Sequence, residues 1–182
     1  MDFKKQAITA KDGKTYILRR AEVADAAALL DVLRSTAEQT PFLLREPDEV
    51  AMTVEQEKDF IRGRIEAPGD AMLLVESEDR VLGLCSLVSM GSFRRYAHRC
   101  GLSIALHKDA WGLGLGRQMM KILLQTAKEV GYEQAELDVM ADNRRAVALY
   151  ESLGFERFGV MPRNMKYADG TYADAIWMMK QL

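Results

Sequence analysis

The chain has 182 residues, of which 48% are hydrophobic and 29% are charged, and its formal net charge is −2. This length and composition suit one globular domain with a sizeable core. The charge is near neutral, which argues against a nucleic-acid partner, since such proteins carry a basic stripe. No apolar run of about 18 residues occurs, so no membrane span is expected. The N-terminal residues, MDFKKQ, lack the apolar run of a signal peptide, and a cytoplasmic protein is expected.

The first half of the chain is predicted to contain both helices and strands. Apolar residues at helical spacing predict helices, and alternating or continuous short apolar runs predict strands. The predicted elements are a strand over 15–20, helices over 23–38 and 53–66, and strands over 71–76 and 80–90. Pro41 and Pro47 predict a loop over 40–48, and Glu78 with Asp79 is the expected turn between the last two strands.

The second half continues this mixed order. Its predicted elements are strands over 99–106 and 135–139, helices over 114–130 and 143–153, and strands over 155–160 and 172–179. Because strands arrive both singly and in hairpins, a mixed sheet with helices on both faces is favoured over a doubly wound parallel sheet. Cys85 and Cys100 lie inside apolar stretches, as small core residues do. His98 and His107 have no clustered partners, so no metal site is expected.

Three alternating glycines, Gly112, Gly114 and Gly116, stand between a predicted strand and a predicted amphipathic helix. Glycine permits positive φ and close approach of the backbone to a ligand. The first N–H groups of a helix have no helical partner and lie at the positive end of its dipole. The segment therefore predicts a site for phosphate or pyrophosphate, to which Arg117 adds a positive charge.

Two common phosphate-binding turns fit these glycines poorly. A P-loop needs a lysine and a Ser or Thr after its last glycine, and Arg117-Gln118 supplies neither. A dinucleotide-binding turn has the spacing GxGxxG in an opening βαβ unit, whereas this cluster is GxGxG and lies past mid-chain. A tight strand-to-helix turn that binds no ligand is the remaining alternative.

Three blocks of this half, in this order, resemble the GNAT family of N-acetyltransferases. They cover roughly residues 99–180 and are the strand, turn and helix around Trp111 to Arg117; Leu137-Asp138-Val139 with Asn143 and the segment ALYESLGF over 148–155; and, more loosely, Asp169-Gly170-Thr171-Tyr172 with Asp174 and Met178. The family usually has Arg or Gln where Trp111 stands, which puts one side-chain contact in doubt.

The resemblance implies a single N-acetyltransferase domain over 1–182. Its fold would be a mixed, mostly antiparallel twisted sheet of about seven strands with helices on both faces. Residues from about 15 to 95 would shape the acceptor site, and residues from about 96 to 182 would bind acetyl-CoA. The acceptor would be a small amine or a protein N-terminal amine, with no nucleic acid, membrane or metal involved, and a homodimer is an allowed assembly. The alternative is a non-catalytic acyl-CoA-binding or interaction module on the same fold.

The resemblance also implies roles for individual residues. The cofactor-binding set is Ile104, Ala105 and Leu106, whose backbone would bond the pantetheine amides, then Trp111, Gly112, Leu113, Gly114, Leu115, Gly116 and Arg117 around the pyrophosphate, and Asn143. Asn143 is equally suited to cap a helix. Tyr150 would protonate the departing thiolate of coenzyme A, or else fill the core on the apolar stripe of its helix.

Two features of the acceptor side remain hypotheses. Three groups, His98, Glu76 and Glu136, are candidates for the general base, and a water relay is an equal alternative. The segment 38–59 holds seven acidic residues against Arg45 and Lys58, a net charge of −5. It would concentrate a cationic amine if it borders the acceptor cleft, and otherwise it is a solvated loop and helix face.

Overall fold

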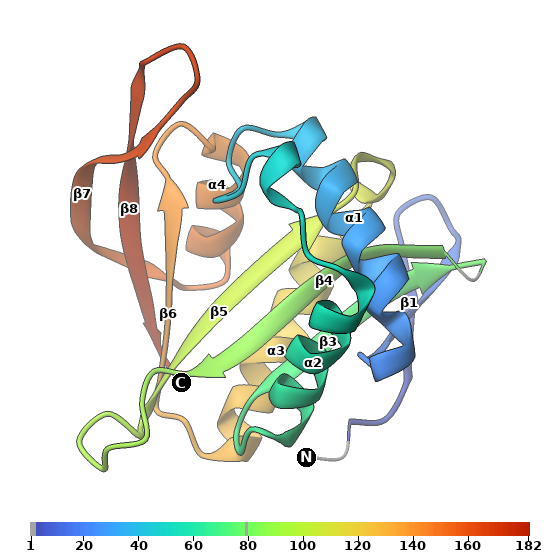
Figure 1. Cartoon of the computed structure of the whole chain (residues 1–182). Coiled ribbons are helices and arrows are strands. Elements are labelled where there is room, and N and C mark those ends of the chain that lie inside the picture. Colours follow the sequence, from blue (N-terminus) through green and yellow to red (C-terminus); the bar gives the residue numbers. More distant parts are fainter. Residues whose placement is uncertain (1–2, 79) are drawn as a thin grey trace.

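The computed structural model describes residues 3–78 and 80–182, which form eight strands and four α-helices (Figure 1). The strands are β1 (Gln6–Thr9), β2 (Thr15–Arg20), β3 (Ala71–Ser77), β4 (Arg80–Ser89), β5 (Arg99–Leu106), β6 (Gln134–Met140), β7 (Glu156–Lys166) and β8 (Tyr172–Gln181). The helices are α1 (Ala26–Gln39), α2 (Val54–Glu66), α3 (Leu115–Val130) and α4 (Arg144–Ser152), with 3₁₀ turns at Val23–Asp25, Pro47–Glu49 and Lys108–Ala110.

All eight strands belong to one sheet in the order β1-β2-β3-β4-β5-β6-β8-β7. Neighbouring strands are antiparallel except β5 and β6, which are the one parallel pair within the described residues. The predicted mixed, mostly antiparallel sheet is therefore confirmed, but the expected count of about seven strands is one too low. The additional strand is β1, which has four residues and buries only Ile8 among them. Its pairing with β2 fixes it, and such a short element has no periodicity to detect.

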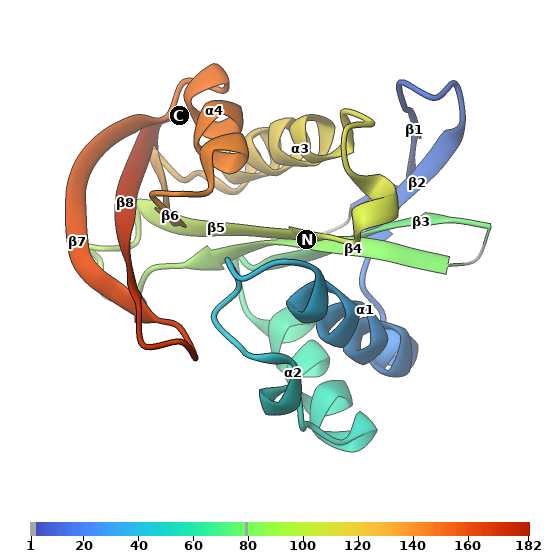
Figure 2. The same ribbon diagram turned by 90° about the horizontal axis from the view of Figure 1, so that it is seen from above.

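Helices cover both faces of the sheet, with α1 and α2 on one side and α3 and α4 on the other (Figure 2). β3 packs against the helices on both faces of the sheet, and its residues 71–75 are all apolar and buried. Leu73 and Val75 belong to the core beneath α3, whereas Met72 and Leu74 belong to the core beneath α1 and α2. Side chains alternate across a strand, so a strand between two layers needs an apolar residue at every position.

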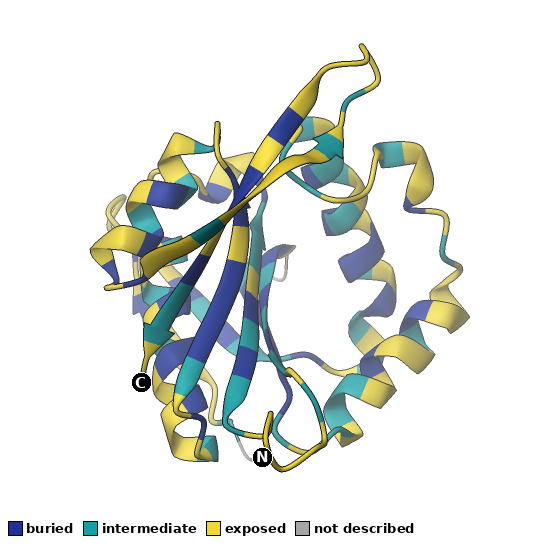
Figure 3. Ribbon diagram, turned by 90° about the vertical axis from the view of Figure 1, so that its left-hand side faces the viewer, coloured by how far each residue is buried: buried dark blue, intermediate teal, exposed yellow. Residues whose placement is uncertain are grey.

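The β7–β8 hairpin extends beyond this double-layered region (Figure 3). No residue of β7, all of which are described, is buried. The strand runs to Lys166, whereas the prediction ended it at Val160. Its register with β8 shifts between Met161 and Met165, and Arg163 in this interval has a positive φ of 54°. Proline is typical of a strand end, so Pro162 led the prediction to stop the strand before this irregularity.

The two cysteines and the turn after β3 can be compared with the predictions directly. Cys85 and Cys100 are free, buried core residues, as predicted, and burial raises the pKa of the Cys100 thiol to about 12. Glu78 follows β3 with a positive φ of 50°, which suits a turn, while Asp79 of the same predicted turn lies outside the described residues. Within the described chain, no helix combines the length and the apolar character that crossing a membrane requires.

Candidate active site

The site begins where the two parallel strands of the sheet separate. β5 and β6 pair only from Arg99 to Gly101 on the first strand and from Gln134 to Glu136 on the second, yet the strands continue to Leu106 and Met140. Figure 1 shows them together near the C-terminus and apart toward the opposite end. Over residues 102–106 the β6-facing edge of β5 therefore lacks a strand partner, which leaves backbone groups available to a ligand.

A cavity of about 820 Å³ occupies this gap. Its volume lies in the range of small-molecule and cofactor sites, roughly 300–1,000 Å³. The lining comes from β5, the glycine turn, α4, β6, the loop after α1 and the hairpin strand β7. Segments far apart in the sequence thus share one site.

The glycine turn forms one end of the cavity. Gly112 and Gly114 have φ values of +78° and +83°, and Gly114 is the N-cap residue of α3. The first helical bond runs from the Gln118 N–H to the Gly114 carbonyl at 3.2 Å. The three N–H groups of residues 115–117 therefore precede the helical bonding pattern, which is the arrangement that binds anions.

Two residues of the predicted phosphate site have side chains outside the cavity. Leu115 is fully buried in the core beneath α3, and Leu113 packs against the same core. The Leu113 carbonyl accepts a hydrogen bond from the backbone N–H of Lys11 at 3.0 Å. Leu113 and Leu115 could therefore contact a ligand only through their backbone N–H groups. Gly116 lines the cavity, and a Cβ atom there would lie 3.4 Å from Cδ1 of Leu106.

Trp111 links the end of β5 to α4. Its indole N–H donates to the Leu106 carbonyl at 2.7 Å, and the guanidinium of Arg145 lies 5.3 Å from the ring centroid. The Leu106 carbonyl therefore already has a protein partner, which leaves Ile104 and Ala105 as the stronger candidates for backbone contact with a ligand. Trp111 therefore contacts both the end of β5 and α4.

Asn143 caps α4, as one of its two predicted roles requires. Its side-chain oxygen accepts from the Ala146 N–H at 3.2 Å. The residue also lines the cavity. Because the cap uses only the oxygen, the side-chain NH₂ group is without a hydrogen-bond partner among the described residues and is free to donate to a ligand.

Tyr150 has both structural and cavity-facing character. Its ring is in the core cluster and meets Phe155 edge-on, with ring centroids 5.9 Å apart. The residue is 7% exposed and lines the cavity, and its hydroxyl has no hydrogen-bond partner within the described part of the chain. Burial, aided by the carboxylate of Asp138, raises the pKa of Tyr150 to about 12. The wall of the cavity therefore includes the neutral hydroxyl of Tyr150, which is available to donate a proton.

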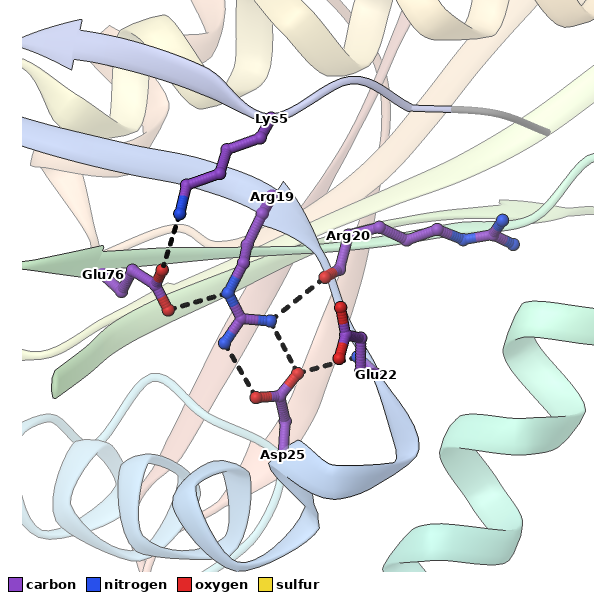
Figure 4. Close-up of polar contacts among 6 residues, drawn as sticks. All are labelled: Lys5, Arg19, Arg20, Glu22, Asp25 and Glu76. Carbon is purple, nitrogen blue, oxygen red and sulfur yellow. Dashed lines mark hydrogen bonds and ion pairs between the residues drawn. The ribbon is translucent and has the colours of Figure 1, made fainter. Parts of the chain in front are cut away.

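The three candidate bases lie elsewhere, since none is among the described residues that line the cavity. Glu76 pairs with Arg19 at 2.7 Å and with Lys5 at 4.0 Å, within the polar cluster of Figure 4. Glu136 accepts two hydrogen bonds from Arg99, which hold the pKa of its carboxyl below the ordinary value. These two carboxylates act as ion-pair partners in the fold, and His98 stands beyond the cavity as well.

Asp138 is the carboxylate that sequence reasoning missed, and it is the one acidic side chain among the described cavity-lining residues. It is exposed, whereas its neighbours Leu137 and Val139 are buried in the core beneath α3. The alternation of β6 therefore directs Asp138 to the opposite face. The sequence could have indicated Asp138 as a polar residue within the predicted strand 135–139. Its place in a cavity depends on the gap between β5 and β6, which the sequence does not reveal.

The acidic segment 38–59 contributes to the cavity through uncharged residues. Thr40 and residues 42–44 line it, while none of the seven acidic side chains is among the described lining residues. Several are engaged locally, as in the pairs Glu55–Lys58 and Asp59–Arg62. Attraction of a cationic substrate by this segment stays a prediction about long-range charge. Across residues 3–78 and 80–182, no group of three or more His, Cys, Asp or Glu side chains is arranged to hold a metal ion.

A family model described as the acetyltransferase (GNAT) family matches residues 30–155. The chain belongs to the GNAT family. The resemblance seen in the sequence is thereby confirmed, and the match extends beyond the glycine turn into the α1 region.

Curated relatives match this GNAT chain over part of their length. The L-amino acid N-acyltransferase of Escherichia coli K12 is 30% identical over 115 residues, which are 63% of this chain and 66% of the relative. The human N-acetyltransferase 8B is 26% identical, over 56% of this chain and 45% of its own. The chain thus spans less than two thirds of these relatives. The L-methionine sulfoximine/L-methionine sulfone acetyltransferase of Pseudomonas paraeruginosa is 23% identical over 91% of this chain and 94% of the relative.

Solved structures agree on the fold. A GNAT-family acetyltransferase from Streptococcus pneumoniae has a TM-score of 0.87 and 26% identity, covering 92% of this chain and 99% of that protein. A ribosomal-protein-alanine N-acetyltransferase from Brucella melitensis has a TM-score of 0.80 and 27% identity, covering 91% and 99%. A Salmonella typhimurium protein with a TM-score of 0.81 and 23% identity, covering 93% and 95%, was solved with its cofactor acetyl-CoA.

Proposed function

We propose that this GNAT protein is an N-acetyltransferase that moves an acetyl group from acetyl-CoA to an amine. The observation that carries the proposal is the cavity between β5 and β6, which joins a helix N-terminus at a glycine turn to an unpartnered tyrosine hydroxyl. Anion-binding backbone and a proton donor in one cavity suit a phosphate-bearing thioester. Family membership and the names of the relatives support the same reaction.

The residues present fit acetyl-CoA. The N–H groups of residues 115–117 would hold the pyrophosphate, with Gly112 and Gly114 allowing it to approach. The unpaired edge at Ile104 and Ala105 would bond the pantetheine amides as an added strand does. Asn143 would donate from its free amide group. When bound, acetyl-CoA supplies the thioester carbonyl that the amine attacks.

Two side chains would move the protons. Asp138 holds the ammonium form of the acceptor and takes its proton, directly or through a water molecule, so that the neutral amine can attack. A backbone N–H on the free edge of β5 stabilises the negative charge that develops on the carbonyl oxygen. As the new C–N bond forms and the C–S bond breaks, Tyr150 gives its proton to the departing sulfur.

The remaining sequence expectations are part of this proposal. Residues from about 15 to 95 shape the acceptor side together with Asp138 and the end of β7, and the other cavity-lining residues between about 96 and 182 bind the cofactor. The location is cytoplasmic, and a homodimer is an allowed assembly. The acceptor is a small amine or a protein N-terminal amine.

Two measurements test the proposal. Calorimetry should detect coenzyme A binding, and thiol release from acetyl-CoA should depend on an added amine. Gly114→Val should abolish the binding, because the φ of +83° disfavours valine and its side chain would obstruct the phosphate site. Gly170→Val is the matched control, with a φ of +86° in a turn outside the cavity. Binding without thiol release across an amine panel would identify a non-catalytic acyl-CoA-binding module, and undiminished binding by a folded Gly114→Val variant would contradict the phosphate site.

A further inference from the structure

We infer that the acceptor is a small amine attached to an apolar group and lacking a carboxylate. The inference rests on the proposed function and concerns the half of the cavity that acetyl-CoA would leave free. It follows from how charge is distributed along the cavity, from one face of the sheet to the other.

The basic side chains that line the cavity are gathered at its glycine-turn end. The stem of Lys11 lies against Gly114, since a Cβ atom there would be 3.6 Å from Cε of the lysine. Arg117, in the first turn of α3, donates to the Ser152 hydroxyl at 2.6 Å. Arg145 stacks over the ring of Trp111 next to that turn. Among the described residues, no carboxylate pairs with Lys11, Arg117 or Arg145, so their charge is available to phosphates.

The other end of the cavity lies on the α1 and α2 side of the sheet. The loop after α1 and the far end of the β7–β8 hairpin both lie on this side in Figure 2. Phe42 of the loop and Met165 of β7 pack against the buried residues Met140, Ala173 and Ala175. Phe42, Met165 and Met140 all line the cavity, so its wall here is apolar.

The polar groups at this end carry one charge. Thr36, Thr40 and Asn164 are neutral, and Asp138 is the one charged side chain of the described lining outside the glycine-turn end. An ammonium group would find its partner in Asp138. A carboxylate on the same molecule would lose its hydration without gaining a cation and would be repelled by Asp138. The cavity therefore selects an amine by its charge and an apolar substituent by contact.

This specificity differs from what the names of two relatives state. One is an L-amino acid N-acyltransferase and another acts on L-methionine sulfoximine and L-methionine sulfone, and an L-amino acid carries a carboxylate next to its amine. The inferred preference therefore separates this chain from these two relatives of the same family.

The test compares two amines that differ in the carboxylate alone. 3-Methylbutylamine has the side chain and amine of leucine without the carboxylate. Its kcat/KM in the thiol-release assay should exceed that of leucine by about 10²-fold or more, because a missing partner for a buried polar group is strongly discriminated. Methylamine, which lacks the apolar group, should fall below 3-methylbutylamine by about 10-fold or more. Preference for leucine, or for methylamine, would overturn the inference and leave the proposed function standing.

A charge variant checks the cause. Leu44 lines the cavity and is 87% exposed, so Leu44→Arg should fold normally. A cation there should raise kcat/KM for leucine and lower it for 3-methylbutylamine by about 5-fold each. Phe93→Arg is the matched control, since Phe93 is 81% exposed and lies outside the cavity. Equal effects of the two variants would refute the charge argument. Absence of thiol release with every amine would overturn the proposed function together with the inference.

Discussion

The substitution Tyr150→Phe removes one hydroxyl and leaves the ring. In the structure the ring packs against Phe155, whereas the hydroxyl has no hydrogen-bond partner in the described residues. Little stability should therefore be lost, on the order of 0.5 kcal/mol or less. The binding of coenzyme A should also be nearly unchanged, because the proposed phosphate site is formed by the glycine turn.

The expected loss is in the chemical step. General acid assistance is typically worth about 10²- to 10⁴-fold, so kcat should fall by about 10²-fold, which corresponds to roughly 2.7 kcal/mol of activation free energy. Burial and Asp138 raise the pKa of Tyr150 to about 12, so the hydroxyl keeps its proton throughout the neutral range. Ionisation of Tyr150 should therefore cause no fall in wild-type kcat between about pH 8 and pH 10, where an ordinary tyrosine begins to ionise.

The assay is thiol release under conditions in which chemistry limits the rate, followed in single turnovers. Tyr132→Phe is the matched control, because Tyr132 is another buried tyrosine, 7% exposed, and lies outside the cavity. Its kcat should equal that of the wild type. If Tyr150→Phe retains kcat within about threefold of wild type, Tyr150 is a packing residue and the thiolate takes its proton from another source.

Two further predictions concern charges at the ends of the chain's first strands. Lys11→Met should weaken coenzyme A binding in calorimetry by about 10-fold and flatten its salt dependence, whereas Lys14→Met in the same turn but outside the cavity should not; equal affinities for the two variants would remove Lys11 from the phosphate site. Arg19→Met should lower the free energy of unfolding at pH 7 by about 2–3 kcal/mol, because it removes the guanidinium partner of the largely buried Asp25 and leaves Glu76 with only the 4.0 Å pair to Lys5. Burial acts to raise the pKa of Asp25, but the hydrogen bonds from Arg19 and from a backbone N–H bring it below the ordinary value. The stability that Arg19 and Asp25 contribute is therefore complete above the ordinary carboxyl pKa and is lost as the pH falls through the lowered pKa of Asp25. Below about pH 4, the free energy of unfolding measured with urea should therefore fall less for Arg19→Met than for the wild type. Identical acid dependence in the two proteins would contradict this assignment.

The regular elements were predictable because their periodicity is strong over many residues. α3 is an example, since the structure confirms the helix predicted over 114–130, and Gly131, with a φ of +100°, caps its end. β1 and the end of β7 were not predictable. The first has too few buried residues for a pattern, and the second continues through an irregular pairing beyond Val160 that has no local signature.

The phosphate end of the site was predictable for a related reason. Its proposed donors, the N–H groups of residues 115–117, are consecutive backbone groups next to Gly112 and Gly114, so a local motif contains nearly the whole geometry. The acceptor end has no such motif. It combines Thr40 and Phe42 with Asp138 and Met165, which come together only through the order of strands in the sheet. Lys11 was missed for the same reason, because its place beside Gly114 depends on β1, which the sequence did not reveal.

The separation of β5 and β6 explains why the two ends of the cavity differ in character. A continuous sheet would isolate the α3 and α4 face from the α1 and α2 face. The gap instead joins them, since both the glycine turn beside α3 and the loop after α1 line the same cavity. A long cofactor anchored by its phosphates on one face can then present its reactive end within the sheet, while an acceptor enters from the other face. Asp138 on β6 and Tyr150 on α4 both border the gap at the point where the two molecules would meet. Under the proposed function, the amides of the cofactor would satisfy the unpaired edge of β5, which would explain why a sheet carries such an edge near its middle.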